Sequence, residues 1–163
     1  MAERFELTDE MRAQIGRESP PYTAEVTTTS VRAFARGVGY TDPVYFDIEA
    51  ARRAGYRHLP APPTYLGTPV FVPGKADNRF SSPLSARLGI NHGLTGLLDG
   101  GTETEYFDVI CAGDELTAVS CTTGLDGRSS PTLGKMLIVT TEIRFTNQQG
   151  KLVAVQRGQA IFY

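Results

Sequence analysis

His58 and His92 are the only imidazoles in this chain of 163 residues, and Cys111 and Cys121 are its only thiols. Acid–base catalysis near neutral pH uses histidine most often. A histidine-based site must therefore use one of these two residues or borrow an imidazole from another chain. Structural zinc sites take about four Cys or His ligands at close, regular spacing. The four residues do not show that spacing, so the sequence predicts no metal site.

Motifs for phosphate binding and for covalent catalysis are absent from the sequence. No glycine-rich loop links a strand to a helix, and no Gly-x-Ser-x-Gly elbow is present. The chain has 16 Lys plus Arg and 18 Asp plus Glu, a net charge of −2, without the basic excess typical of nucleic-acid binders. The N-terminus lacks the apolar core of a signal peptide, and no apolar run is long enough to span a bilayer. We therefore expect a cytoplasmic protein that binds neither nucleic acid nor membrane.

Helical segments and one strand are expected in the first part of the chain. They are a helical extension over residues 1–20 that Thr8 caps, a strand over Tyr22–Thr29, a helix after Ser30, a helix after Asp47 and a helical segment from Pro63 to Thr68. Ser, Thr and Asp side chains accept hydrogen bonds from the free N–H groups that begin a helix, and Pro suits its first turn.

Long strands are expected in the second half of the chain. The four strand-like runs are Thr102–Ile110, Leu116–Leu125, Gly134–Asn147 and Lys151–Tyr163, separated by turns at 112–114, 126–129 and 147–150. Apolar and polar residues alternate in the third run, which indicates one buried and one solvated face. Apolar residues on both faces of the last run indicate a strand inside the sheet. Short turns favour an antiparallel meander, and helices set apart from such a sheet make a single α+β domain over residues 1–163.

Two stretches of the chain carry a family pattern. The first is Gly39–Asp47 (GYTDPVYFD) followed by Ala61–Tyr65 (APPTY), and the second is Asp99–Tyr106 (DGGTETEY) followed by Ala112–Leu116 (AGDEL). Together they resemble the MaoC-like hydratases and dehydratases over residues 20–163. The closer resemblance is to the N-terminal, dehydratase-like branch, which is similar to dehydratase domains of large fatty-acid synthases.

The resemblance implies a hot-dog fold, in which a long antiparallel sheet wraps around a central helix. It implies substrates that are acyl thioesters of coenzyme A or acyl-carrier protein, and the reversible addition of water to a 2-enoyl thioester. It implies no cofactor and no metal. In this branch such a domain pairs with a second hot-dog domain, so a homodimer or a heterodimer with a catalytic chain is expected.

The family places its catalytic carboxylate and imidazole in a loop that reads Gly-Asp-x-Asn-Pro-x-His. On this chain the Asp position falls on Tyr40, the Asn position on Asp42 and the His position on Tyr45. The family's oxyanion donor is a backbone N–H at a His-Gly step that opens the central helix. This step falls on Pro62–Pro63, and proline has no N–H. If the placement shifts by one residue, Thr64 donates instead.

These departures predict an acyl-thioester-binding subunit of a 2-enoyl hydratase or 3-hydroxyacyl dehydratase that needs a catalytic hot-dog partner. One alternative is a self-sufficient hydratase in which Asp42 and His92 are displaced catalytic residues. A second alternative is a hot-dog thioesterase that positions water with one carboxylate, and a third is a non-enzymatic thioester binder. Asp42 also suits a turn before Pro43, and His92 also suits a solvated loop.

Other polar residues are candidates for contacting the substrate. They are Tyr40, Tyr45, Thr64, Tyr65, Asp99 and Gly100. The phenols can donate hydrogen bonds to a thioester or can pack, and Asp99 can instead form a turn with the glycines after it. A set of basic residues, Arg52, Arg53, Arg57, Lys75 and Arg79, fits either the phosphates of coenzyme A or a solvated helix face.

Overall fold

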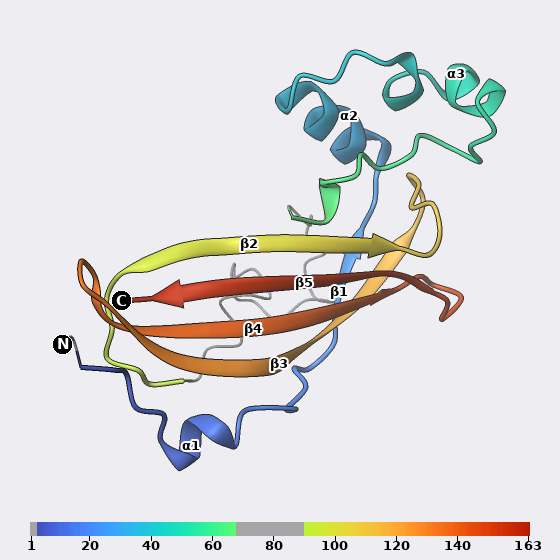
Figure 1. Cartoon of the computed structure of the whole chain (residues 1–163). Helices are drawn as coiled ribbons and strands as arrows, with labels where there is room; N and C mark the ends of the chain where they lie inside the picture. Colours follow the sequence, from blue (N-terminus) through green and yellow to red (C-terminus); the bar gives the residue numbers. More distant parts are fainter. Residues whose placement is uncertain (1–2, 68–89) are drawn as a thin grey trace.

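A five-stranded antiparallel sheet dominates the computed structural model, which describes residues 3–67 and 90–163 (Figure 1). The strands are β1 (Tyr22–Glu25), β2 (Leu97–Tyr106), β3 (Glu115–Ser130), β4 (Gly134–Thr146) and β5 (Leu152–Phe162). Their order across the sheet is β1-β3-β4-β5-β2. The predicted meander of β3, β4 and β5 is confirmed, and β5 lies between β4 and β2 as its apolar pattern predicts.

The alternation predicted for the third run is confirmed in β4. Leu137, Val139, Ile143 and Phe145 are buried together with Thr141, whereas the residues that alternate with these five are only partly buried or exposed. One face of the sheet therefore carries the core.

The predicted turn at residues 126–129 is wrong, because these residues continue β3 to Ser130. Asp126–Ser129 pair with residues of β4, and the ladder shifts at a bulge between Thr122 and Gly124. The pairing with β4 overrides the local turn signal, and the chain reverses at 131–133 instead.

Strand β2 also differs from the run expected at Thr102–Ile110, because it begins at Leu97 and ends at Tyr106. The glycines at 100 and 101 lie inside the strand, where the register shifts between Asp99 and Gly101. A φ of +109° at Gly101 suits a β-bulge that only glycine adopts without strain.

The helices are short and begin at caps. They are α1 (Asp9–Arg12), α2 (Thr28–Gly37), α3 (Ile48–Arg53) and the 3₁₀ helices η1 (Pro43–Tyr45) and η2 (Tyr65–Gly67). Thr8 and Asp47 cap α1 and α3 as predicted, but α1 is only four residues long. Thr27, not Ser30, caps α2, and Ser30 completes a capping box with it, so β1 stops at Glu25. Of the helical segment expected from Pro63 to Thr68, the structure shows η2 at Tyr65–Gly67, and Thr68 lies outside the described residues.

Two apolar clusters fill the buried face of the sheet. One lies where α2 and α3 meet the sheet and includes Val31, Ala51, Leu116 and Phe145. The other includes Met11 of α1 with Leu137, Val139 and Phe162 near the C-terminal end of β5. Figure 1 shows α2 and α3 together beyond one end of the sheet, opposite the C-terminus.

The N-terminal segment covers the β3 edge of the sheet beyond β1. The N–H groups of Phe5, Gly16 and Ser19 donate to carbonyls of Arg128, Thr122 and Ser120 at 3.1, 2.8 and 2.8 Å. Covering an edge strand in this way blocks its pairing with another chain. Among the described residues, the edge formed by β2 has no comparable cover, since β2 pairs only with β5.

Replacing Gly127 by alanine is expected to detach the N-terminal segment. A Cβ at Gly127 overlaps the carbonyl oxygen of Phe5, whereas a Cβ at Gly124 in the same strand lies 3.6 Å from the Cβ of Thr140, an ordinary contact. Overpacking of this kind costs ~1–3 kcal/mol. Urea unfolding should show that loss for G127A, with faster proteolytic clipping near residue 5, and little change for G124A. Equal stabilities of the two variants would contradict this packing.

Candidate functional site

A groove of about 480 Å³ lies between the helical segment and the connection that leads from β2 to β3. We call it the aromatic groove. Its walls are Tyr45, Tyr56, Pro60, Ala61, Pro63, Tyr106, Phe107, Asp108, Val109 and Ile110. Tyr106, Phe107 and Val109 expose 39, 49 and 46% of their surface, unusually much for large apolar side chains. The groove is therefore open to solvent and suited to an apolar ligand.

The loop after α2 brings Tyr40 and Tyr45 together. Gly39, with φ of +82°, ends α2, and the N–H of Tyr40 donates back to the carbonyl of Ala35 at 2.9 Å. The rings of Tyr40 and Tyr45 then stack with centroids 5.3 Å apart and planes inclined by 21°. The two positions that the resemblance assigns to the catalytic pair are thus neighbours in space, but both hold phenols.

The phenols of the groove are hydrogen-bond donors and not bases at neutral pH. Burial, and then the charges of Tyr40, Tyr56 and Asp42, raise the pKa of Tyr45 above its usual value of 10.0. Burial raises the pKa of Tyr106 to about 12, and its hydroxyl donates to the carbonyl of Pro63. Neither hydroxyl is ionised near pH 7, so neither can accept a proton from water.

Asp42 has a structural task in this loop. Its Oδ1 accepts the N–H of Val44 at 3.0 Å and so caps η1. Its side chain is exposed and is absent from the lining of the aromatic groove. This hydrogen bond supports the interpretation of Asp42 as a turn residue. No contact among the described residues supports a catalytic role for Asp42.

The step from Pro62 to Tyr65 offers one free N–H. The two prolines have none, and Tyr65 donates its N–H to the carbonyl of Pro62 at 2.9 Å. Within the part of the chain that the structure describes, the N–H of Thr64 has no partner. The side chain of Tyr65 is buried, bonds Ser30 Oγ through its hydroxyl at 2.7 Å and packs edge-on against Phe34. Thr64 thus stays a candidate oxyanion donor, whereas Tyr65 belongs to the core.

Asp99 and Gly100 shape the bulge of β2. The Oδ1 of Asp99 accepts the N–H of Gly101 at 2.9 Å, which is a local turn contact. Gly100 lies against Gln159 of β5, where an added Cβ would come within 2.9 Å of the Gln159 Cβ. Asp99 pairs with Ala160 near the C-terminal end of β5 and Gly100 is the bulged residue beside it, so the structure does not bring them to the aromatic groove.

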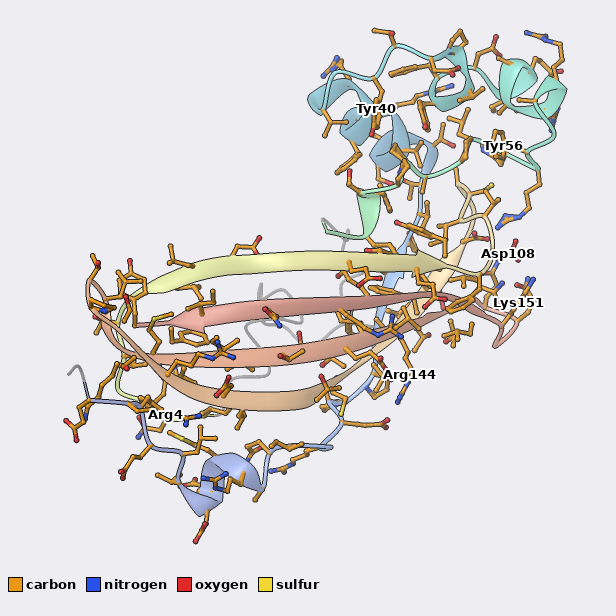
Figure 2. All side chains as sticks on the ribbon, viewed as in Figure 1. Arg4, Tyr40, Tyr56, Asp108, Arg144 and Lys151 are labelled. Carbon is orange, nitrogen blue, oxygen red and sulfur yellow. The ribbon has the colours of Figure 1, made fainter. Side chains whose placement is uncertain are left out.

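His92 lies at the end of the sheet away from Tyr40. Its ring packs on Phe162 with centroids 4.3 Å apart, and its Nδ1 accepts the N–H of Leu94 at 3.0 Å. Phe162 precedes the C-terminus, which Figure 1 places opposite the helical end, where Figure 2 labels Tyr40. Asp42 and His92 are therefore not brought together.

The stability of the fold is expected to fall at mildly acidic pH through His92. Burial lowers the pKa of His92 below 6.5, so below that pH the unfolded chain binds more protons than the folded one. The stabilising contribution is present above pH 6.5 and is lost as the pH falls through the folded-state value. His92→Asn keeps an acceptor for the N–H of Leu94, so urea unfolding at pH 7.5 and 5.5 should show a smaller loss for the variant. The same loss in both proteins would contradict this role.

An ion pair between the half-exposed Arg57 and the buried Asp114, which the sequence did not predict, anchors the wall of the groove. Arg57 Nη2 binds the carboxylate of Asp114 and also donates to the carbonyl of Val109 at 3.2 Å. The side chain of Asp114 is only 4% exposed, and its Oδ2 also accepts the N–H of Cys111 at 2.9 Å. Asp114 lies in the family motif AGDEL, which could have marked it as a residue of interest. Its partner Arg57 is 57 residues away in the sequence, so the motif does not indicate the ion pair.

The proposed basic patch is largely neutralised where the structure describes it. Arg57 binds Asp114, and Arg52 binds Glu49 at 2.8 Å. Lys75 and Arg79 lie outside the described residues. Figure 2 shows Lys151 beside Asp108, which lies in the connection from β2 to β3. Lys151 Nζ and Asp108 Oδ2 are 2.7 Å apart. This contact lowers the pKa of Asp108 and keeps the carboxylate ionised.

Among the described residues, no three His, Cys, Asp or Glu side chains gather in a way that could hold a metal ion. No helix in the described ranges is long and apolar enough to cross a bilayer.

The family model for the FAS1-like, dehydratase domain region matches residues 13–156. The chain belongs to this family. A UPF0336 protein of Parafrankia sp. (strain EAN1pec) is 32% identical over 159 residues, which cover 94% of this chain and 90% of that protein. A probable enoyl-CoA hydratase alpha subunit of Thermomonospora curvata is 26% identical over 81% of this chain and 43% of that protein.

Solved structures show the same fold. The HadBC (3R-hydroxyacyl-ACP dehydratase) complex of Mycobacterium tuberculosis aligns with a TM-score of 0.68 and 24% identity over 91% of this chain and 96% of that one. The ChsH1–ChsH2 complex of the same organism aligns with a TM-score of 0.74 and 19% identity over 90% of this chain and 88% of that one. The hot-dog fold expected from the family resemblance is confirmed, and both of these neighbours are complexes.

Proposed function

We propose that the chain is the acyl-thioester-binding subunit of a 2-enoyl hydratase or 3-hydroxyacyl dehydratase, with the catalytic pair supplied by a second hot-dog chain in the cytoplasm. The observation that carries this proposal is the stack of Tyr40 on Tyr45, 5.3 Å apart, at the two positions of the family's carboxylate and imidazole. Hydration needs a group that takes a proton from water and one that protonates the α-carbon. Two phenols, of which Tyr45 has a pKa raised by burial, supply no base at neutral pH.

The aromatic groove supports the binding half of the proposal. Its apolar walls suit an acyl chain, and the hydroxyl of Tyr45 can donate a hydrogen bond to a thioester oxygen. Thr64 offers a further N–H donor nearby in sequence. The names of the relatives, an enoyl-CoA hydratase subunit and a 3R-hydroxyacyl-ACP dehydratase, support thioesters of coenzyme A or acyl-carrier protein as the ligand class.

The position of Tyr106, in the groove wall and at the end of an edge strand, supports a role for a partner chain. Tyr106 is the last residue of β2, whose outer edge carries no other strand of the described chain. A second hot-dog chain that pairs with this edge reaches the mouth of the groove. Its catalytic pair then acts on a thioester that this chain holds.

Hydration of crotonyl-CoA tests the proposal. The rate is measured for this chain alone, for a hot-dog chain that carries Gly-Asp-x-Asn-Pro-x-His alone, and for a mixture of the two. The expected result is turnover in the mixture and no enzymatic rate from the 163-residue chain alone. Ordinary hydratase rates from this chain alone would overturn the proposal and favour the self-sufficient alternative. Release of free thiol from an acyl-CoA would favour a thioesterase.

A further inference from the structure

Another hollow, of about 500 Å³, borders the connection from β2 to β3, and we call it the polar pocket. Arg57 and His58, part of that connection and the turn from β4 to β5 at 147–151 form its walls. Lys151 lies at the end of this turn, beside Asp108, as Figure 2 shows. The volume is within the ~300–1,000 Å³ typical of small-molecule sites. The proposed function gives the polar pocket no role.

The carboxylates of the polar pocket are occupied by the chain itself. Asp114 Oδ2 accepts from Arg57 and from the N–H of Cys111 at 2.9 Å. Asp108 Oδ2 accepts Lys151 Nζ at 2.7 Å, and its Oδ1 accepts the next backbone N–H at 2.8 Å. In each pair the cation is the more exposed side chain, at 51 and 59% against 4 and 40% for the carboxylates. The cations therefore form the outer surface of the pocket.

The other acceptors of the polar pocket are also used within the chain, which leaves donors free. His58 Nδ1 accepts the N–H of Leu59 at 2.8 Å, so the neutral ring carries its proton on Nε2. Gln148 Oε1 accepts the N–H of Glu115 at 3.1 Å, and Asn147 Oδ1 accepts two N–H groups of the turn at 3.1 and 3.0 Å. Among the described residues, Nε2 of His58 and the two side-chain NH₂ groups have no acceptor.

A pocket with occupied acceptors and free donors suits a ligand that is rich in acceptors. Both contacts of Arg57 use Nη2, so Nε and Nη1 remain, and the ammonium of Lys151 keeps two further N–H groups. Phosphate oxygens accept such charge-assisted hydrogen bonds from Arg and Lys. The two carboxylates offset the charge of the two cations, so directed donors, more than net charge, would hold the ligand.

We infer that the polar pocket binds a phosphate group, held by Lys151, Arg57 and His58 together with the carboxamides of the β4–β5 turn. A phosphorylated nucleoside and free phosphate share this chemistry, and the volume of the pocket has room for the larger of them. The inference goes beyond the proposed function, because it depends on the donors of this pocket and not on the aromatic groove.

Calorimetric titration of the full chain with phosphate-bearing probes tests the inference. Adenosine 3′,5′-bisphosphate should bind saturably, and adenosine, which lacks the phosphates, should bind at least ~10-fold more weakly. Lys151→Met removes the ammonium but keeps an apolar stem, and it should weaken binding of the bisphosphate ~10-fold. Inorganic phosphate separates the two sources. Equally tight binding assigns the pocket to free phosphate, and weaker binding assigns it to a phosphorylated nucleoside.

Lys135→Met is the matched control for this test. Lys135 also pairs with an exposed carboxylate, that of Glu3 at 2.9 Å, and the variant loses the same charge outside the pocket. It should bind the bisphosphate like the wild type. His58→Asn keeps an acceptor for the N–H of Leu59 but removes the outer nitrogen, so it should also weaken binding.

Absence of saturable binding for both phosphate probes would overturn the inference. Wild-type affinity in both Lys151→Met and His58→Asn would overturn it as well, because the phosphate would then lie elsewhere. None of the probes carries an acyl group, so the result is independent of the crotonyl-CoA turnover test.

Discussion

In a complex with a hot-dog chain that carries Gly-Asp-x-Asn-Pro-x-His, replacing the histidine of that motif by alanine is expected to lower turnover by ~10²–10⁴-fold. Asp42→Asn in this chain is expected to change turnover less than about threefold, because Asp42 caps η1 and lies outside the lining of the aromatic groove. The asymmetry follows from the phenols at positions 40 and 45, which leave this chain without a base at the two positions of the family's catalytic pair.

The asparagine substitution is chosen because it keeps an oxygen that accepts the N–H of Val44. A loss of activity in Asp42→Asn would then report the missing charge and not a disordered loop. Initial rates of crotonyl-CoA hydration, measured for the complex with one variant chain at a time, give the comparison. A loss of 100-fold or more from Asp42→Asn would contradict a purely binding role and would make Asp42 a displaced base.

Removing Arg57 is expected to produce the largest loss of stability. Arg57→Met leaves the carboxylate of Asp114, 4% exposed, with the N–H of Cys111 as its remaining side-chain contact. Breaking a buried ion pair on one side costs ~3–5 kcal/mol, and because Arg57 itself is half-exposed we expect about 3 kcal/mol. The connection from β2 to β3 also loses its bond to the carbonyl of Val109, so the wall of the aromatic groove loosens.

Arg52→Met is the matched control for this prediction. Arg52 makes the same kind of contact with Glu49, but both side chains are largely exposed, at 59 and 66%. Exposed pairs of this type contribute ~0.2–1 kcal/mol. Urea unfolding of the two variants should therefore separate clearly. Equal losses would show that burial of Asp114 does not decide the strength of its pairing.

The strands and caps could be predicted from the sequence because their signals are local. Alternation in 134–147 gave β4, and Thr8 and Asp47 mark the starts of α1 and α3. The turn predicted at 126–129 is wrong because pairing with β4 is a tertiary effect, which the local sequence does not indicate. Gly100 and Gly101 indicated a turn before the strand, but they lie at a bulge inside β2. Bulges and turns use the same residue types, so the sequence does not separate them.

The candidate site was predictable only as far as the family pattern reaches. The pattern assigns Tyr40 and Tyr45 to the two positions of one catalytic pair, and in the structure their rings stack. It did not indicate Tyr106 or the pair of Arg57 with Asp114, because these contacts join residues 43 and 57 positions apart. His92 was a catalytic candidate because the chain has only two histidines. In the structure its ring packs on Phe162, at the end of the sheet away from Tyr40.

Calorimetric titration of crotonyl-CoA into this chain alone, followed by analysis of the cell contents, tests the central claim most directly. The account predicts saturable binding without hydrated product, and binding at least about 10-fold weaker for Tyr45→Ala, because the ligand contacts the groove. Tyr163→Ala, at the opposite end of the sheet, should bind like the wild type. Absence of saturable binding, or conversion of the thioester at enzymatic rates, would contradict a subunit that binds the substrate and leaves the chemistry to its partner.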